Sequence, residues 1–314
     1  MDFTVPARGA HVSLPDLIAL RFPARQLCLA RKKRALSALA GPNKSNFRGR
    51  GIDFEEVRRY QAGDDIRTID WRVTARSGNA HTKLFQEERE RPVLVVVDQR
   101  HNMFFGSSHC FKSVLASHLA SLLTWSALDN GDRIGGLVFN DQEHREIRPR
   151  RSRKTALALL SQINTYNHML AQSPEQPPTS GESSFASMVH NLRRIAKPGA
   201  SIILISDFNG AQDEHAQEYL FQLAQHTEIA ALDCSDPLEQ ELPRSGYYAV
   251  TDGQQRSELQ TSDKALRQAY HHRFMQRQEE LTIALQKLGI PLVRASTGDV
   301  PFQVLKQYYG KSRG

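Results

Sequence analysis

The chain has few cysteines and no long apolar run. Its three cysteines, Cys28, Cys110 and Cys234, are odd in number and far apart among 314 residues, which argues against a disulfide framework or a zinc site. No apolar run approaches the roughly 20 residues that a membrane-spanning helix needs. The first residues also lack the basic start and apolar stretch of a secretion signal. We therefore expect reduced thiols, no membrane span and a cytoplasmic protein.

The common short motifs of enzymes are also missing. The sequence contains no Gly-x-Ser-x-Gly, His-Glu-x-x-His or Cys-x-x-Cys motif, so the usual hydrolase, zinc-protease and zinc-ribbon patterns are excluded. Gly310-Lys311-Ser312 matches the end of a phosphate-binding loop, but Leu305 takes the first glycine position and no helix can follow. We assign no catalytic residue and expect no cofactor.

Positive charge is in excess, and it is unevenly placed. Residues 1–90 carry 17 Lys and Arg against 11 Asp and Glu, whereas residues 91–314 carry 24 against 23. A basic N-terminal third could contact nucleic acid, an anionic membrane surface or an acidic protein. Its basic residues are interleaved with acids and are not clustered with aromatics, which disfavours nucleic acid. Nucleic-acid binding is therefore kept only as an alternative.

Apolar runs and helical patterns alternate after residue 91. The apolar runs are Val93–Val97, Ile134–Phe139, Ile202–Ile205, Ile229–Leu232 and Pro291–Val293, and the helical stretches are Phe111–Asp129, Lys154–Met169, Phe185–Ala196, Glu214–Gln225 and Lys264–Leu288. Nearly continuous apolar runs are typical of strands buried on both faces of a parallel sheet. The alternation predicts an α/β fold with a doubly wound, mainly parallel sheet.

Three basic or polar stretches lie outside this alternation. Residues 24–40 predict a basic helix that ends at Gly41-Pro42. Residues 46–90 are dense in Arg, Asp and Gly without a helical period, and they predict a small irregular segment of short strands and turns. The basic run Arg145–Lys154 is interpreted as a solvated connection, or as a contact with an anionic partner.

Two of the predicted strands end in an aspartate. Val93–Val97 is followed by Asp98, and Ile202–Ile205 is followed by Ser206-Asp207. Carboxyl ends of parallel strands meet at the edge of the sheet where ligands bind. Converging carboxylates would suit Mg²⁺, which takes oxygen ligands. The spacing fits equally well with two aspartates that only cap the following helices.

One long block carries a family resemblance. Residues 49–76 are GRGIDFEEVRRYQAGDDIRTIDWRVTAR, followed by Lys83-Leu84-Phe85 and Glu87-Glu88-Arg89 before the first strand. This block resembles the signature of the bacterial domain-of-unknown-function family 58, and the resemblance runs from about Gly41 to Phe302. It implies an N-terminal extension with the basic helix (1–45), the signature segment (46–91) and a von Willebrand A-like domain (92–314). It also implies a MoxR-type AAA ATPase as the partner.

The same resemblance points to a degenerate metal site. The family pattern is Asp-x-Ser-x-Ser after the first strand, a later Thr or Ser, and an Asp after another strand. The corresponding positions are Asp98, Arg100, Asn102, Ser183 and Asp207. Arg100 and Asn102 replace the two serines, and a guanidinium offers no lone pair to a metal. We expect that no divalent metal binds and that Arg100 pairs with the carboxylates instead.

Charged and aromatic residues alternate within the signature segment. The positions singled out are Asp53, Glu55, Arg58, Tyr60, Gly63, Asp64, Asp65, Arg67, Asp70, Trp71, Arg72 and Arg76. Guanidinium groups pair with carboxylates and stack on aromatic rings. The segment is therefore interpreted as a structural web of ion pairs, as a docking surface for the ATPase, or as an unrecognised active site.

These observations favour a non-enzymatic interaction or adaptor protein that works with a MoxR-type AAA ATPase, in the assembly or maturation of another complex. Two alternatives stay open: a metal-dependent phosphoesterase or nuclease that uses Asp98, Asp207 and the acids of the signature segment, and a nucleic-acid-binding protein.

Overall fold

A six-stranded sheet forms the centre of the computed structural model, which describes residues 5–29, 52–61, 69–87, 92–172, 184–244, 246–251 and 256–311. The strand order is β10-β7-β6-β3-β4-β5. Neighbouring strands are parallel except for β4 and β5. The strands are β3 (Pro92–Asp98), β4 (Arg133–Phe139), β5 (His144–Arg150), β6 (Ser201–Ser206), β7 (Glu228–Ser235) and β10 (Leu292–Ser296). The mainly parallel, doubly wound α/β fold expected from the sequence is confirmed.

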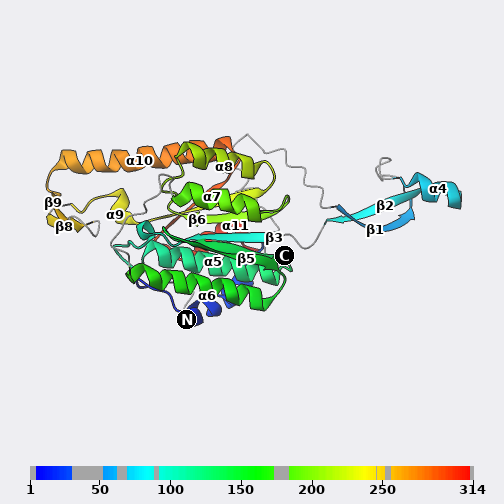
Figure 1. Ribbon diagram of the computed structural model, residues 1–314, viewed down its shortest axis with the longest axis horizontal. Helices are drawn as coiled ribbons and strands as arrows, with labels where there is room; N and C mark the ends of the chain where they lie inside the picture. The colour runs from blue at the N-terminus through cyan, green and yellow to red at the C-terminus, as the bar shows by residue number, and fades with distance from the viewer. Residues whose placement is uncertain are drawn as a thin grey trace.

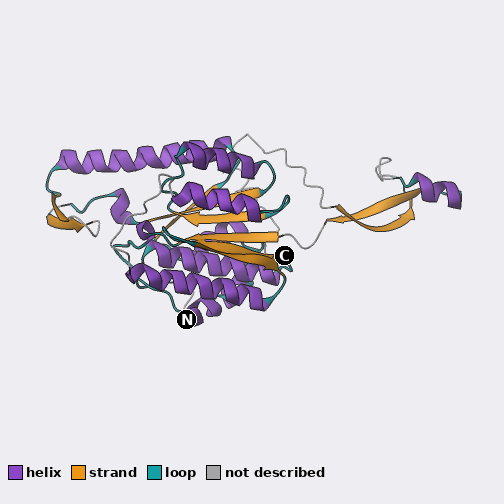
Figure 2. Ribbon diagram, in the orientation of Figure 1, coloured by secondary structure: helices purple, strands orange, loops and turns teal. Residues whose placement is uncertain are grey.

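Helices cover both faces of this sheet (Figures 1 and 2). One face carries α5 (Lys112–Asp129), α6 (Arg153–Met169) and α11 (Pro301–Tyr309), and the other carries α7 (Ser184–Ile195), α8 (Glu214–Ala224) and α10 (Lys264–Lys287). Each of the five helices predicted after residue 91 is present, and its ends lie within about a residue of the expected ones. Among the described helices, none combines the length and apolar character needed to cross a membrane.

The central strand β3 shows why the apolar runs lack alternation. Val93, Val95 and Val97 face the α5 and α6 side, whereas Leu94 and Val96 face the α7 and α8 side. Successive side chains of a strand point to opposite faces, so a strand covered on both faces is apolar at every position. The sheet therefore lies between two hydrophobic clusters.

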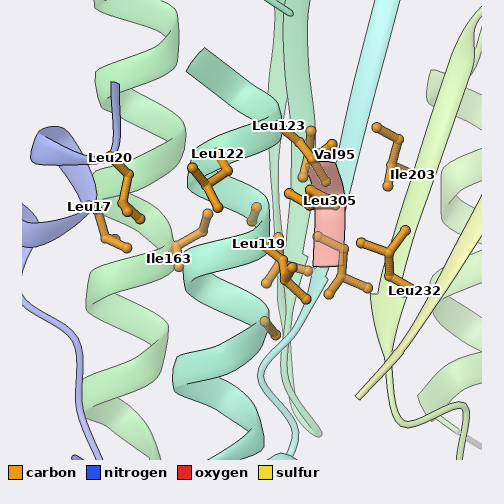
Figure 3. Packing of buried hydrophobic residues seen from close by; sticks show 14 of the residues in the cluster. Leu17, Leu20, Val95, Leu119, Leu122, Leu123, Ile163, Ile203, Leu232 and Leu305 are labelled. Atoms are coloured by element: carbon orange, nitrogen blue, oxygen red, sulfur yellow. The ribbon is translucent and has the colours of Figure 1, made fainter. Parts of the chain in front are cut away.

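The N-terminal segment adds a third layer on the α5 and α6 side. Its helices α1 (Leu14–Ala19) and α2 (Arg21–Ala24) bring Leu17 and Leu20 against these two helices, and Figure 3 shows both side chains beside Leu122 and Ile163. The Ser121 hydroxyl and the Trp125 indole N–H both donate to the carbonyl of Leu17, at 2.6 and 3.1 Å.

The basic helix predicted over residues 24–40 is wrong at its start. Helix α2 ends at Ala24, and Leu27 instead pairs with Gly310 in an antiparallel bridge. The N–H of Cys28 donates to the Tyr309 carbonyl at 2.7 Å, and the N–H of Lys311 donates to the Gln26 carbonyl at 2.9 Å. These long-range main-chain bonds replace the local bonds of a helix. Residues 30–40 lie outside the described part of the chain.

The basic run at residues 145–154 is not a connection, and this interpretation is corrected. Its first six residues belong to β5, the antiparallel edge strand, and α6 begins at Arg153. The strand was missed because most of its side chains are exposed, so it lacks an apolar pattern. Other elements that the sequence did not predict include α1, α2, α9 (Pro237–Gln240), α11, and the hairpin of β8 (Tyr247–Thr251) and β9 (Arg256–Gln260).

The signature segment forms an antiparallel pair, β1 (Ile52–Arg59) with β2 (His81–Glu87), and a short helix, α4 (Trp71–Ser77). Figure 1 shows this unit at one end of the molecule, away from the six-stranded sheet. The strands were expected and the helix was not. Asp70 caps α4 by accepting from the N–H groups of Arg72 and Val73, which is a favourable N-terminal signal.

Candidate functional site

The candidate site lies at the carboxyl edge of the sheet, where β3 and β6 end side by side. Asp98 is the last residue of β3, Ser206 is the last residue of β6, and Asp207 follows it. Asp98 has no exposed surface, and Asp207 is 7% exposed. The Ser206 hydroxyl donates to an Asp98 carboxylate oxygen at 2.6 Å. The two aspartates therefore lie at one edge, as the strand order requires.

The guanidinium of Arg100 occupies the space between these carboxylates. Its Nη2 donates to Asp98 Oδ2 at 2.6 Å, and its Nε lies 3.0 Å from both Asp98 oxygens. The same Nη2 lies 3.6 Å from Asp207 Oδ1. The main-chain N–H of Arg100 also donates to Asp98 Oδ1, at 2.9 Å. Asp98 is thus paired bidentately with an arginine two residues further along the chain.

Two aromatic rings hold the Arg100 side chain in place. The guanidinium carbon lies 5.5 Å from the ring centres of both Phe139, at the end of β4, and Phe185, in α7. Both distances are within the range of cation–π attraction. Arg100 is only 3% exposed, so its charge is shielded from water by these rings and compensated by Asp98. Burial alone would lower the pKa of Arg100, but the charge and hydrogen bonds of Asp98, together with the charge of Asp207, raise it above its usual value.

A strained turn after β6 completes the surroundings of Arg100. Phe208 has a φ of 54°, a left-handed conformation that is unusual for a bulky residue. The Ser206 hydroxyl accepts from the Phe208 N–H, and Asp207 Oδ1 accepts from the Asn209 N–H. This turn places the Asn209 carbonyl 2.9 Å from Arg100 Nη1, which donates to it. Backbone strain of this kind persists where the surroundings fix it.

A second buried cation, Lys112, lies at the same edge. It is the first residue of α5 and is 1% exposed. Its Nζ lies 3.0 Å from Asp207 Oδ2 and 2.7 Å from Glu239 Oε1. Sequence reasoning missed this residue. The one available signal was a lysine in the first turn of an otherwise apolar helix.

The two cations set the charge state of the carboxylates. Burial alone would raise the pKa of Asp207, but Lys112 and Arg100 together lower it below its usual value. For Asp98, burial raises the pKa and the Arg100 guanidinium opposes this rise. Burial likewise raises the pKa of Asp233, a residue of β7 that accepts from Gln278 Nε2, to about 6. Buried charges of this kind are stable only when they are paired and hydrogen-bonded.

The residues at this edge do not fit a divalent metal. Arg100 and Lys112 already supply two positive charges to Asp98 and Asp207, and neither cation can act as a metal ligand. Asn102 lies in a short 3-10 turn (His101–Met103) and is exposed to solvent, and Ser183 lies outside the described residues. The described residues hold no group of three or more His, Cys, Asp or Glu side chains that could bind a metal. No chemical step through a metal is therefore assigned.

The signature positions are spread over the projecting unit. Arg58 and Tyr60 lie at the end of β1 and are half-buried, and Trp71 begins α4 with 71% of its surface exposed. Arg72 and Arg76 are exposed on α4. Asp53 and Glu55 belong to β1, whereas Gly63, Asp64, Asp65 and Arg67 lie outside the described residues. The ion-pair web, the docking surface and the active site remain hypotheses for this segment.

Several solved structures are similar to parts of this chain. The conserved hypothetical protein BatB from Bacteroides thetaiotaomicron has a TM-score of 0.34 at 12% identity, over 63% of this chain and 98% of that chain. An aerotolerance-related membrane protein from Bacteroides fragilis has a TM-score of 0.41 at 13% identity, over 69% and 98%. The SpRpn10 VWA domain has a TM-score of 0.36 at 11% identity, over 69% and 95%. At this degree of similarity these structures carry no argument about partner or activity.

Sequence comparison finds longer matches. The chain is 28% identical over 274 residues to an uncharacterized protein of Mycobacterium tuberculosis, covering 87% of this chain and 83% of that protein. An uncharacterized protein of Mycobacterium bovis matches to the same extent. Residues 56–280, most of the chain, match the family described as "Protein of unknown function DUF58". The chain therefore belongs to the DUF58 family.

Proposed function

We propose that this protein is a non-enzymatic interaction module that works with a MoxR-type AAA ATPase. The observation that carries the proposal is the guanidinium of Arg100 between Asp98 and Asp207. The strand ends that would hold a catalytic or adhesive metal ion are instead closed by the protein's own cations. We infer that the carboxyl edge has a structural role and that partner proteins bind to other parts of the surface.

The projecting unit of β1, β2 and α4 supports a docking role. Its helix α4 presents Trp71, which is 71% exposed, next to the exposed Arg72 and Arg76. Tryptophan and arginine are enriched among the residues that dominate binding energy in protein interfaces. When a partner covers a large aromatic side chain that was exposed to water, the burial of its apolar surface stabilises the complex. We therefore place the ATPase contact on α4 and the adjoining strands.

Replacing Trp71 by serine is expected to weaken capture of the ATPase by at least about tenfold and to leave the fold intact. Most of the side chain is exposed, so the melting temperature should stay close to that of the wild type. The measurement is a pull-down from cells that express both proteins, with the amount of recovered ATPase compared between variants. Loss of a central aromatic anchor commonly costs 2 kcal/mol or more, on the order of this change.

Tyr247 provides a matched control, because it is 76% exposed and lies on the other hairpin, in β8. The Tyr247→Ser variant should recover as much ATPase as the wild type. The proposal is wrong if wild-type protein recovers no such ATPase, and the placement on α4 is wrong if both variants lose it equally.

A further inference from the structure

A hollow of about 590 Å³ lies at the amino edge of the sheet, opposite to the edge that holds Asp98. It forms where β3, β4 and β6 begin, at Pro92, Arg133 and just before Ser201, and where α7 ends near Ile195. Residues of β5 form one wall. Its volume is within the range of ligand-binding pockets. We call this hollow the cationic groove.

The cationic groove is named for its five basic side chains. These are Arg133, Arg148, Arg150, Arg194 and Lys197, and all five are exposed. Within the described part of the chain, none of them takes part in an ion pair. Among the described lining residues the one acid is Glu146, which lies 3.9 Å from His144. Uncompensated cations that converge on a concavity attract an anionic ligand.

The alternation of β5 divides its arginines between two faces. Arg148 and Arg150 line the cationic groove. Arg145 and Ile147 point to the other face, where Ile147 packs against the first hydrophobic cluster and the charge of Arg145 opposes the rise that burial causes in the pKa of Tyr166 of α6. Alternation places Arg148 opposite to Ile147, and the irregular register between Ile147 and Arg150 brings Arg150 to the groove as well. Strand β5 therefore places two arginines, Arg148 and Arg150, in the groove and a third, Arg145, outside it, where it can serve as a control.

The position of β5 adds main-chain groups to this binding surface. It is the last strand of the six-stranded sheet and pairs with β4 on one side. An edge strand presents a row of N–H and C=O groups to which another extended chain can be hydrogen-bonded. Partner segments bind in this mode by adding a strand, with their alternate side chains held in neighbouring pockets.

The composition of the groove floor favours a peptide over a nucleic acid as the ligand. Pro149 and Ile195, both partly exposed, supply apolar surface between the cations. The described lining residues include no Trp, Tyr or Phe, on which the bases of a single strand would stack. In a peptide, apolar side chains that alternate with carboxylates would match the apolar floor and the surrounding basic side chains. An acidic peptide fits this chemistry better than RNA or DNA.

We propose that the cationic groove binds an acidic, extended segment of a partner protein. The segment lies along β5, and its carboxylates pair with Arg148 and Arg150 from the strand and with Arg194 from the end of α7. Alternate apolar side chains of the segment cover Pro149 and Ile195. The inference does not depend on the ATPase partner, because the groove and the α4 surface are on different parts of the chain.

The test uses the full chain and a fluorescein-labelled peptide of alternating Glu and Val, followed by fluorescence anisotropy. Saturable binding is expected, and it should weaken as salt is raised, because exposed charges are screened. Arg148→Glu and Arg194→Glu should each raise the Kd by at least about tenfold, since a like charge then faces the peptide. Arg145→Glu makes the same charge change on the same strand and should leave the Kd within about threefold.

Two probes of different chemistry complete the test. A peptide of alternating Lys and Val should not bind, and an oligothymidylate should bind more weakly than the Glu and Val peptide. Circular dichroism checks that each variant is folded, which is expected because these arginines are exposed. The proposal is overturned if the acidic peptide does not bind, if Arg145→Glu weakens binding as much as Arg148→Glu, or if the oligonucleotide binds more tightly.

Discussion

Replacing Arg100 by methionine is expected to lower the free energy of unfolding by about 3–5 kcal/mol. The change removes the guanidinium that pairs with Asp98 at 2.6 Å and leaves a carboxylate with no exposed surface uncompensated. Methionine is long and apolar, so it can still fill the space between the rings of Phe139 and Phe185. Urea unfolding of the variant and the wild type measures the difference.

The pH dependence of this loss identifies its cause. Without Arg100, burial raises the pKa of Asp98 further above its unfolded value. The native state of the variant then binds a proton more tightly than the unfolded state, so its stability falls as pH rises between the two pKa values. The loss should therefore be larger at about pH 8 than at about pH 4.5.

Two further variants serve as controls. The double change Arg100→Met with Asp98→Asn removes both charges and should recover part of the lost stability, because no unpaired charge is then buried. Arg145→Met removes an exposed arginine and should change stability by no more than about 0.5 kcal/mol. An Arg100→Met variant as stable as the wild type at both pH values would show that the pairing contributes nothing.

Replacing Lys112 by methionine should also cost about 3–5 kcal/mol. Its ammonium group joins Asp207 to Glu239 at 3.0 and 2.7 Å and is almost completely buried. Lys112 and Arg100 both lower the pKa of Asp207. Removal of the Lys112 charge should therefore raise the pKa of Asp207. The stability that Asp207 contributes above its unfolded pKa is then reduced.

Thermal unfolding monitored by circular dichroism measures this effect. Lys154→Met provides the control, since Lys154 lies in the first turn of α6 and is exposed, and it should leave the melting temperature nearly unchanged. An equal effect of the two changes would mean that the buried ion pairs of Lys112 do not hold the carboxyl edge together.

The sheet could be predicted because burial on both faces leaves a direct trace in the sequence. Val93–Val97 is apolar at every position because each residue faces one of the two hydrophobic clusters. Strand β5 left no such trace, because as an edge strand it exposes most of its side chains. The prediction of a basic helix was wrong at its start for another reason. Leu27 and Cys28 bond to the distant C-terminal segment, and local sequence does not encode that contact.

The site was predictable only in part. Asp98 and Asp207 could be placed together because each follows a parallel strand, and Arg100 could be paired with them because it lies two residues after Asp98. Lys112 could not be assigned, because its carboxylate partners come from Asp207 and Glu239, which are 95 and 127 residues away. Pairing over such separations depends on how α5 and α9 pack against the sheet edge.

The buried cations at the carboxyl edge should repel a divalent metal ion. A divalent ion about 4 Å from Arg100 would be repelled by roughly 8 kcal/mol at an effective dielectric constant of 20, twice the value for unit charges. The strand ends are thus held together without an ion, and the fold should not depend on metal supply.

Calorimetric titration of the full chain with Mg²⁺ and with Mn²⁺ tests this account most directly. We predict no heat of binding from either ion at this edge and no rise in the melting temperature, since a ligand that does not bind the native state cannot stabilise it. Micromolar binding by the folded protein that is abolished by Asp98→Asn would contradict the account.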